Sequence, residues 1–78
     1  MKITVYTKNG CPQCDMTKRV LDGEGIEYKV INVEEDEKAF TYVKDVLQLT
    51  SMPVVVVNNG EEEEIFTGFR PDKLQQLK

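Results

Sequence analysis

The sequence has no histidine, no tryptophan and only two cysteines among its 78 residues. A closed zinc site uses about four cysteine or histidine ligands. A metal here would therefore need ligands from a second subunit, a small thiol or carboxylates. Apolar runs that approach the roughly 20 residues of a membrane-spanning helix are also missing. We expect no bound metal and no membrane association.

Basic residues are too few and too scattered for a nucleic-acid surface. Ten Lys and Arg stand against fourteen Asp and Glu, for a net charge of −4, whereas a phosphate binder gathers basic residues on one face. The densest charge run, Glu61, Glu62, Glu63 and Glu64, is typical of a solvated edge beside a turn. The first residues alternate polar and apolar, without the long apolar stretch of a secretory signal. We therefore expect a cytoplasmic protein.

Both cysteines lie in one motif, Cys11-Pro12-Gln13-Cys14. A structural disulfide across so short a loop would add little stability, because the stabilisation grows with loop length. It would not persist in a reducing cytosol either. A pair of thiols that make and break a disulfide is therefore the favoured interpretation, ahead of a structural bridge or half of a metal site.

The pattern of apolar residues predicts seven elements in one domain, residues 1–78. Ile3 and Val5 alternate with polar residues, as in a half-buried strand. Pro12 opens a helix over residues 12–22 that glycines end, and a strand over 27–33 follows. A second helix is predicted over residues 34–49, where Glu35, Asp36 and Glu37 favour its start. The four valines of residues 54–57 predict a strand buried on both faces.

A turn at residues 58–60, a strand over 62–66 and a short helix containing Leu74 and Leu77 complete the chain. The order is β-α-β-α-β-β-α. Strands separated by helices pair in parallel through right-handed crossovers, and the hairpin adds antiparallel pairing. We therefore expect an α/β fold with a small, four-stranded mixed sheet flanked by helices on both faces.

The two cysteines occupy different positions on the first predicted helix. Cys11 precedes the helix, where unpaired N–H groups and the helix dipole favour a thiolate, the form that attacks disulfides. Cys14 shares an inward stripe with Thr17 and Leu21, so we expect it to be the more buried. Cys11 is thus the predicted nucleophile and Cys14 the resolving thiol. The residues between them, Pro12 and Gln13, would tune the rigidity of the helix start.

Three motifs together resemble a known family: "CPQC" after the first strand, "SMPVVV" before the third, and "TGFRPD" before the last helix. They resemble the thioredoxin fold and, more closely, the glutaredoxin-like NrdH-redoxin family, over nearly the whole chain. The resemblance implies a dithiol–disulfide oxidoreductase that thioredoxin reductase reduces with electrons from NADPH. Its electron acceptor would be class Ib ribonucleotide reductase. We expect a monomer with no bound cofactor, working through a reversible Cys11–Cys14 disulfide.

The resemblance also implies roles for residues outside the cysteine motif. Pro53 would be a cis-proline facing the cysteines, and Met52 would offer its backbone to an extended substrate segment. Gly68, Phe69 and Arg70 would contact partners, with support from Pro12, Pro71 and Asp72. Phe66 stands where many members have tryptophan, and we expect it to retain an aromatic surface.

Two other functions remain open from the sequence. The "CPxC" motif and Lys8 suggest a glutathione-dependent glutaredoxin, although such proteins carry a glycine pair and an acidic residue where this chain has "TGFRPD". A metal or iron–sulfur module that uses both thiols across a dimer is the third possibility. The sequence assigns no functional role to the four glutamates.

Overall fold

The structure is a computed structural model, and it describes residues 1–49 and 51–77. These residues form four strands and three α-helices, with a π-helical turn, η1, directly after the second helix. In chain order they are β1 (Lys2–Thr7), α1 (Pro12–Gly23), β2 (Lys29–Asn32), α2 (Glu37–Thr41), η1 (Tyr42–Val46), β3 (Val54–Asn59), β4 (Glu62–Thr67) and α3 (Pro71–Gln75). The predicted order of strands and helices is confirmed.

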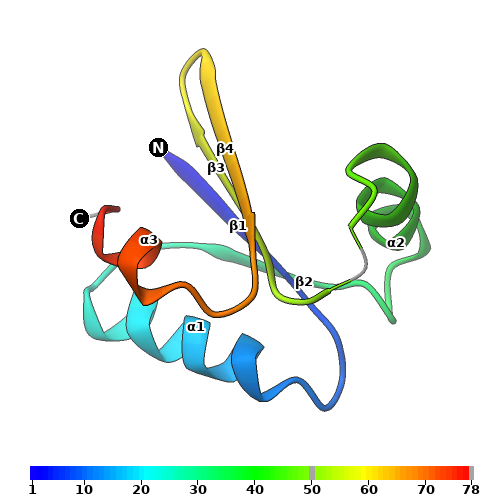
Figure 1. The fold of residues 1–78 in the computed structure, drawn as a ribbon, viewed down its shortest axis with the longest axis horizontal. Coiled ribbons are helices and arrows are strands. Elements are labelled where there is room, and N and C mark those ends of the chain that lie inside the picture. Colours follow the sequence, from blue (N-terminus) through cyan, green and yellow to red (C-terminus); the bar gives the residue numbers. More distant parts are fainter. Residues whose placement is uncertain (50, 78) are drawn as a thin grey trace.

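The four strands form one mixed sheet in the order β2-β1-β3-β4 (Figure 1). β1 and β2 are parallel, as expected of strands joined by a helix. β1 and β3 are antiparallel, and β3 and β4 form an antiparallel hairpin. Val5 on β1 lies between Val30 of β2 and Val55 of β3. The two most apolar strands therefore occupy the centre of the sheet.

Helices cover both faces of this sheet and enclose two separate cores. The first lies under α1 and α3 and consists of Ile3, Val5, Leu21, Val55, Val57, Phe66, Leu74 and Leu77. The second lies under α2 and η1 and consists of Val33, Ala39, Val43, Val54 and Val56. Successive side chains of a strand point to opposite faces, so the four valines of β3 are divided between both cores. Their predicted burial is confirmed.

The position of Phe66 corrects one expectation from the sequence. Phe66 is only 7% exposed and belongs to the core under α1 and α3. The alternation of β4 turns its side chain toward this core, whereas Ile65, one residue earlier, packs against the core under α2 and η1. Phe66 therefore contributes packing, and the expected aromatic surface is absent at this position.

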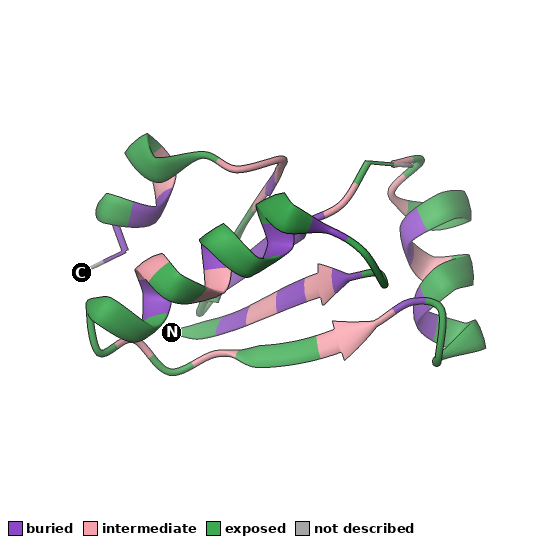
Figure 2. Cartoon of the chain, turned by 90° about the horizontal axis from the view of Figure 1, so that it is seen from below, coloured by how far each residue is buried: buried purple, intermediate pink, exposed green. Residues whose placement is uncertain are grey.

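Helix α1 begins and ends with recognisable sequence signals. Pro12 is its first residue, where the missing N–H costs nothing. At its other end the Ile26 N–H donates to the Leu21 carbonyl at 3.0 Å, and Gly25 adopts a φ of +69°. The buried residues Cys14, Thr17 and Leu21 follow the predicted stripe. Figure 2 shows buried segments alternating with exposed ones along α1. The stripe places the second cysteine against the sheet.

The second helix differs from the continuous helix predicted over residues 34–49. Asp36 is its N-cap residue, and the Asp36 carboxylate accepts a hydrogen bond from the Ala39 N–H at 3.1 Å. After Thr41 the turns widen, and the Leu47 N–H donates to the Tyr42 carbonyl at 3.0 Å. Gln48 then ends the helix with a φ of +57°. Val43 belongs to the core under α2 and η1, and Leu47 packs against it.

Tyr28, just before β2, anchors the chain that leaves α1. Its hydroxyl donates to the Asp22 carboxylate at 2.8 Å, and burial together with this bond raises the pKa of Tyr28 to about 12. The unfolded state loses this proton near pH 10, whereas the folded state holds it. The contribution of Tyr28 to the free energy of unfolding is therefore expected to fall as pH rises from about 10 to about 12.

An absorbance titration of the tyrosines checks this expectation. One component should ionise near pH 12 in the unaltered protein and be missing in Tyr28→Phe. Asp22→Asn keeps the ring but removes the carboxylate, so it should move that component toward a lower pKa. A Tyr28→Phe titration with the same high-pH component would contradict the assignment.

The four glutamates lie on the β3–β4 hairpin, at the opposite end of the molecule from the start of α1 (Figure 1). All four are exposed, and Glu64 pairs with Lys73 of α3 at 3.1 Å. The interpretation of this run as a solvated edge is confirmed.

Candidate active site

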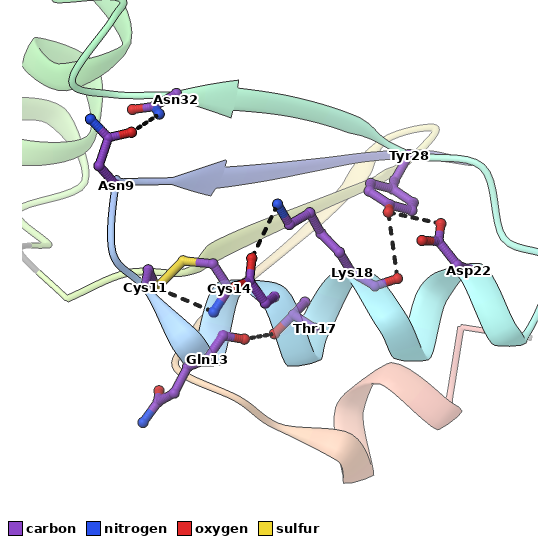
Figure 3. Close-up of polar contacts among 10 residues, drawn as sticks. Asn9, Cys11, Gln13, Cys14, Thr17, Lys18, Asp22, Tyr28 and Asn32 are labelled. Atoms are coloured by element: carbon purple, nitrogen blue, oxygen red, sulfur yellow. Dashed lines mark hydrogen bonds and ion pairs between the residues drawn. A yellow bond between two sulfur atoms is a disulfide. The ribbon is translucent and has the colours of Figure 1, made fainter.

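Cys11 and Cys14 form a disulfide at the start of α1 (Figure 3). Cys11 is the N-cap residue, with extended backbone angles, and its sulfur accepts a hydrogen bond from the Cys14 N–H at 3.2 Å. Cys11 is 8% exposed and Cys14 is 1% exposed, so the prediction that Cys14 is the more buried is confirmed. The outer sulfur therefore lies next to an N–H donor and the positive end of the helix dipole.

Charged residues lie on both sides of the cysteine motif in the sequence, Lys8 before it and Asp15 after it. Asp15, the residue after Cys14, pairs with Lys18 at 3.5 Å. This pairing offsets part of the negative charge that Asp15 brings to the helix start. Lys8 contributes an exposed positive charge on the approach to Cys11.

An open depression of about 360 Å³ lies over Cys11. Its lining comes from the loop after β1, the first residues of α1 and the segment before β3. The lining residues are Lys8, Gly10, Cys11, Pro12, Gln13, Ser51 and Met52. The fold thus brings Met52 beside the cysteine motif, although about forty residues separate them in the chain.

The segment before β3 is attached to the loop before α3. The Met52–Pro53 peptide bond is cis, and Pro53 is buried. The Pro53 carbonyl accepts a hydrogen bond from the Gly68 N–H at 2.9 Å. Gly68 has a φ of +76°, a conformation that glycine adopts at little cost.

The loop before α3 also contacts the cysteine motif. The Phe69 N–H donates to Oε1 of Gln13 at 3.2 Å, and the Phe69 side chain packs partly on the core under α1 and α3. Sequence reasoning assigned Gln13 only to helix rigidity. Its place between the cysteines was a signal of importance, but nothing in the sequence pointed to a partner 56 positions away.

Arg70 and Asp72 pair with each other at the start of α3. The guanidinium donates from Nε at 3.2 Å and from a terminal nitrogen at 3.0 Å, a fork that grips both carboxylate oxygens. This bond holds the pKa of the Asp72 carboxyl below its usual value. Pro71, between them, is the first residue of α3. Both charged groups are exposed, and neither lines the depression over Cys11.

Two further observations concern metals and membranes. Within residues 1–49 and 51–77, no three His, Cys, Asp or Glu side chains gather in a way that could hold a metal ion. No helix in this part of the chain is long and apolar enough to cross a bilayer.

Known proteins resemble this chain over nearly its whole length. A glutaredoxin family model matches residues 3–61. The gene 56 protein of Mycobacterium phage D29 is 40% identical over 75 residues, covering 96% of this chain and 80% of the phage protein. The glutaredoxin-like protein NrdH of Escherichia coli K12 is 34% identical over 77 residues, 99% of this chain and 89% of that protein. The solved structure of Escherichia coli NrdH-redoxin has a TM-score of 0.84 at 35% identity, covering 100% of this chain and 96% of that one.

The fold and the disulfide at the helix start define a thiol–disulfide oxidoreductase with a thioredoxin-like fold. Within that class, the chain belongs to the glutaredoxin family and to its glutaredoxin-like NrdH-redoxins.

Proposed function

We propose that this protein is a dithiol electron carrier that thioredoxin reductase reduces and that in turn reduces class Ib ribonucleotide reductase. NADPH would supply the electrons through the reductase. We further propose that residues 1–78 act as one domain, as a monomer and in the cytoplasm. The observation that carries the proposal is the near full-length likeness to NrdH-redoxins, one of which is described as having a thioredoxin-like activity profile.

The start of α3 supports a reductant other than glutathione. A helix start binds a carboxylate, such as those of glutathione, through free N–H groups. Here Pro71 occupies the first helical position and has no N–H. The acid that follows, Asp72, is already engaged by Arg70. This loop therefore offers little to a free tripeptide.

In the proposed reaction the Cys11 thiolate attacks one sulfur of the partner's disulfide. A mixed disulfide forms, and the partner's second sulfur leaves as a thiolate. The Cys14 thiolate then attacks the Cys11 sulfur, which re-forms the Cys11–Cys14 disulfide and releases the partner's first sulfur as a second thiolate. Two electrons pass to the partner, whose thiolates take up two protons, and the reductase later returns two electrons to the carrier. The N–H of Cys14 already points to the Cys11 sulfur, so it would stabilise the attacking thiolate.

Partner proteins would bind along the depression over Cys11. Met52 lines it and precedes the buried Pro53, so its backbone would pair with an extended segment of the partner as an added strand. Gly68, Phe69 and Arg70 would contact the same segment or its neighbours. Pro12, Pro71 and Asp72 would support these positions.

A glutathione-dependent glutaredoxin is the second candidate. The match to the glutaredoxin family model and the position of Lys8 beside Cys11 favour it, because an ammonium group there would attract a carboxylate of glutathione.

Consumption of NADPH by the oxidised protein in two parallel mixtures separates the candidates. One mixture contains thioredoxin reductase, and the other contains glutathione with glutathione reductase. We expect NADPH consumption in the first mixture to be at least about tenfold faster than in the second. The reduced protein should then reduce class Ib ribonucleotide reductase. Turnover with glutathione alone would reject the proposed electron route and support the second candidate.

A further inference from the structure

Two consecutive N–H groups tie the loop before α3 to two different parts of the active site. The Gly68 N–H donates to the carbonyl of the buried Pro53 at 2.9 Å. The next N–H, of Phe69, donates to the Gln13 side chain at 3.2 Å. One bond fixes the loop to the segment before β3, and the other fixes it to the start of α1. The second depends on a side chain, so a single substitution can remove it.

The Gln13 side chain is suited to this bond. An amide N–H can pair only with the oxygen of a glutamine side chain, so the contact with Phe69 determines which way the amide is turned. In Figure 3 the side chain leaves the helix on the side away from β1 and β2. A Cβ at position 68 would lie 3.5 Å from the same oxygen. This is an ordinary van der Waals distance, so the residue at position 68 is favoured to be glycine by its φ of +76°.

Gln13 is also part of the surface that a partner protein would meet. It is exposed and lines the depression over Cys11, together with Met52. Its backbone carbonyl accepts a hydrogen bond from the buried Thr17 hydroxyl at 2.9 Å, so its backbone is held while its side chain reaches outward. Gln13 thus spans the short distance from the reactive sulfur to residues 68–70.

We propose that Gln13 is a positioning residue that holds residues 68–70 in place for protein partners and leaves the reactivity of Cys11 unchanged. The inference rests on the proposed docking of partners against residues 68–70, but not on which reductase supplies the electrons. A protein disulfide uses both Cys11 and this loop, whereas a small disulfide uses only Cys11. Gln13 should therefore matter for the first substrate and not for the second.

The test uses protein that dithiothreitol has reduced and that has then been freed of it, so that no reductase takes part. Rate constants are measured with insulin, a protein disulfide, and with 2-hydroxyethyl disulfide, a small neutral one. Gln13→Met keeps the length of the side chain but removes the acceptor. We expect the rate constant with insulin to fall about three- to tenfold, as for one lost hydrogen bond, and that with the small disulfide to change less than about twofold. Hydrogen exchange at the Phe69 amide should become faster.

Three matched variants complete the experiment. Gln13→Glu keeps an acceptor, and any effect of its charge on Cys11 acts on both substrates. The insulin rate constant divided by the small-disulfide rate constant should therefore return to that of the unaltered protein. Gln13→Asn is too short to reach Phe69 and should match Gln13→Met, which provides a second variant should one fail to fold. Gln75→Met makes the same chemical change at an exposed position of α3 and should alter neither rate constant.

Three results would overturn the inference. An equal fall in the rate constants with both substrates would mean that Gln13 acts on Cys11 itself. An unchanged rate constant with insulin would mean that residues 68–70 keep their position without the Gln13 side chain. Loss with insulin but unchanged exchange at Phe69 would mean that Gln13 touches the partner directly. A thioredoxin reductase assay that fails with the unaltered protein would reject the proposed electron route and leave this test intact.

Discussion

Cys11→Ser is expected to abolish disulfide reduction, with a loss on the order of a thousandfold or more. A serine hydroxyl cannot form the mixed disulfide, and it is almost wholly protonated at neutral pH. Cys11 is the more exposed of the two cysteines, and its sulfur accepts a hydrogen bond from the Cys14 N–H, which fits its proposed role as the nucleophile. Reduction of insulin disulfides, followed as turbidity, measures the effect.

Cys14→Ser is the matched control, because it should leave the first attack intact and block the second. A mixed disulfide between Cys11 and the partner should then accumulate, and mass spectrometry would detect it as an adduct that dithiothreitol removes. The reverse pattern, with an adduct in Cys11→Ser and none in Cys14→Ser, would exchange the proposed roles.

Leu21→Ala is expected to lower the free energy of unfolding strongly. Leu21 is 0% exposed and lies in the core under α1 and α3. Removing a leucine side chain from such a site typically lowers the free energy of unfolding by about 2–5 kcal/mol. A domain of this size loses roughly 4–8 °C in melting temperature per kcal/mol, so the melting temperature should fall by about 10 °C or more. Urea unfolding and a thermal melt measure both quantities.

The control for this prediction is on the same helix. Met16 is 44% exposed, and Met16→Ala should change the free energy of unfolding by less than about 0.5 kcal/mol. A loss below about 1 kcal/mol for Leu21→Ala would mean that α1 is not held to the sheet by this side chain. Insulin reduction by the folded fraction should persist in Leu21→Ala, because Leu21 lies about two helical turns beyond Cys14 and does not line the depression over Cys11.

Features set by neighbouring residues were predictable from the sequence. Pro12 marked the start of α1, and the stripe from Cys14 to Leu21 indicated which face is buried. The four valines of β3 predicted a strand with a core on either side. Each of these depends on local backbone preference or on the period of the apolar residues, which the sequence displays directly.

Features set by distant contacts were not predictable. The periodicity of the apolar residues favoured one continuous helix, and nothing in the sequence of residues 34–49 indicated the change to π-helical turns after Thr41. The bond between Gln13 and Phe69 joins residues 56 positions apart. The inward orientation of Phe66 depends on the register of β4 against β3, which the sequence did not specify.

The position of the disulfide at the edge of α1 has a consequence for recognition. The helix is held by main-chain bonds such as that from the Asp15 N–H to the Cys11 carbonyl at 3.2 Å. These main-chain bonds do not involve the sulfur atoms, so we expect the helix to stay in place when the disulfide opens. The reduced and oxidised forms of the protein should therefore have nearly the same shape. A partner protein that binds one form and releases the other must distinguish two thiols from one disulfide bond, within a surface only a few atoms wide.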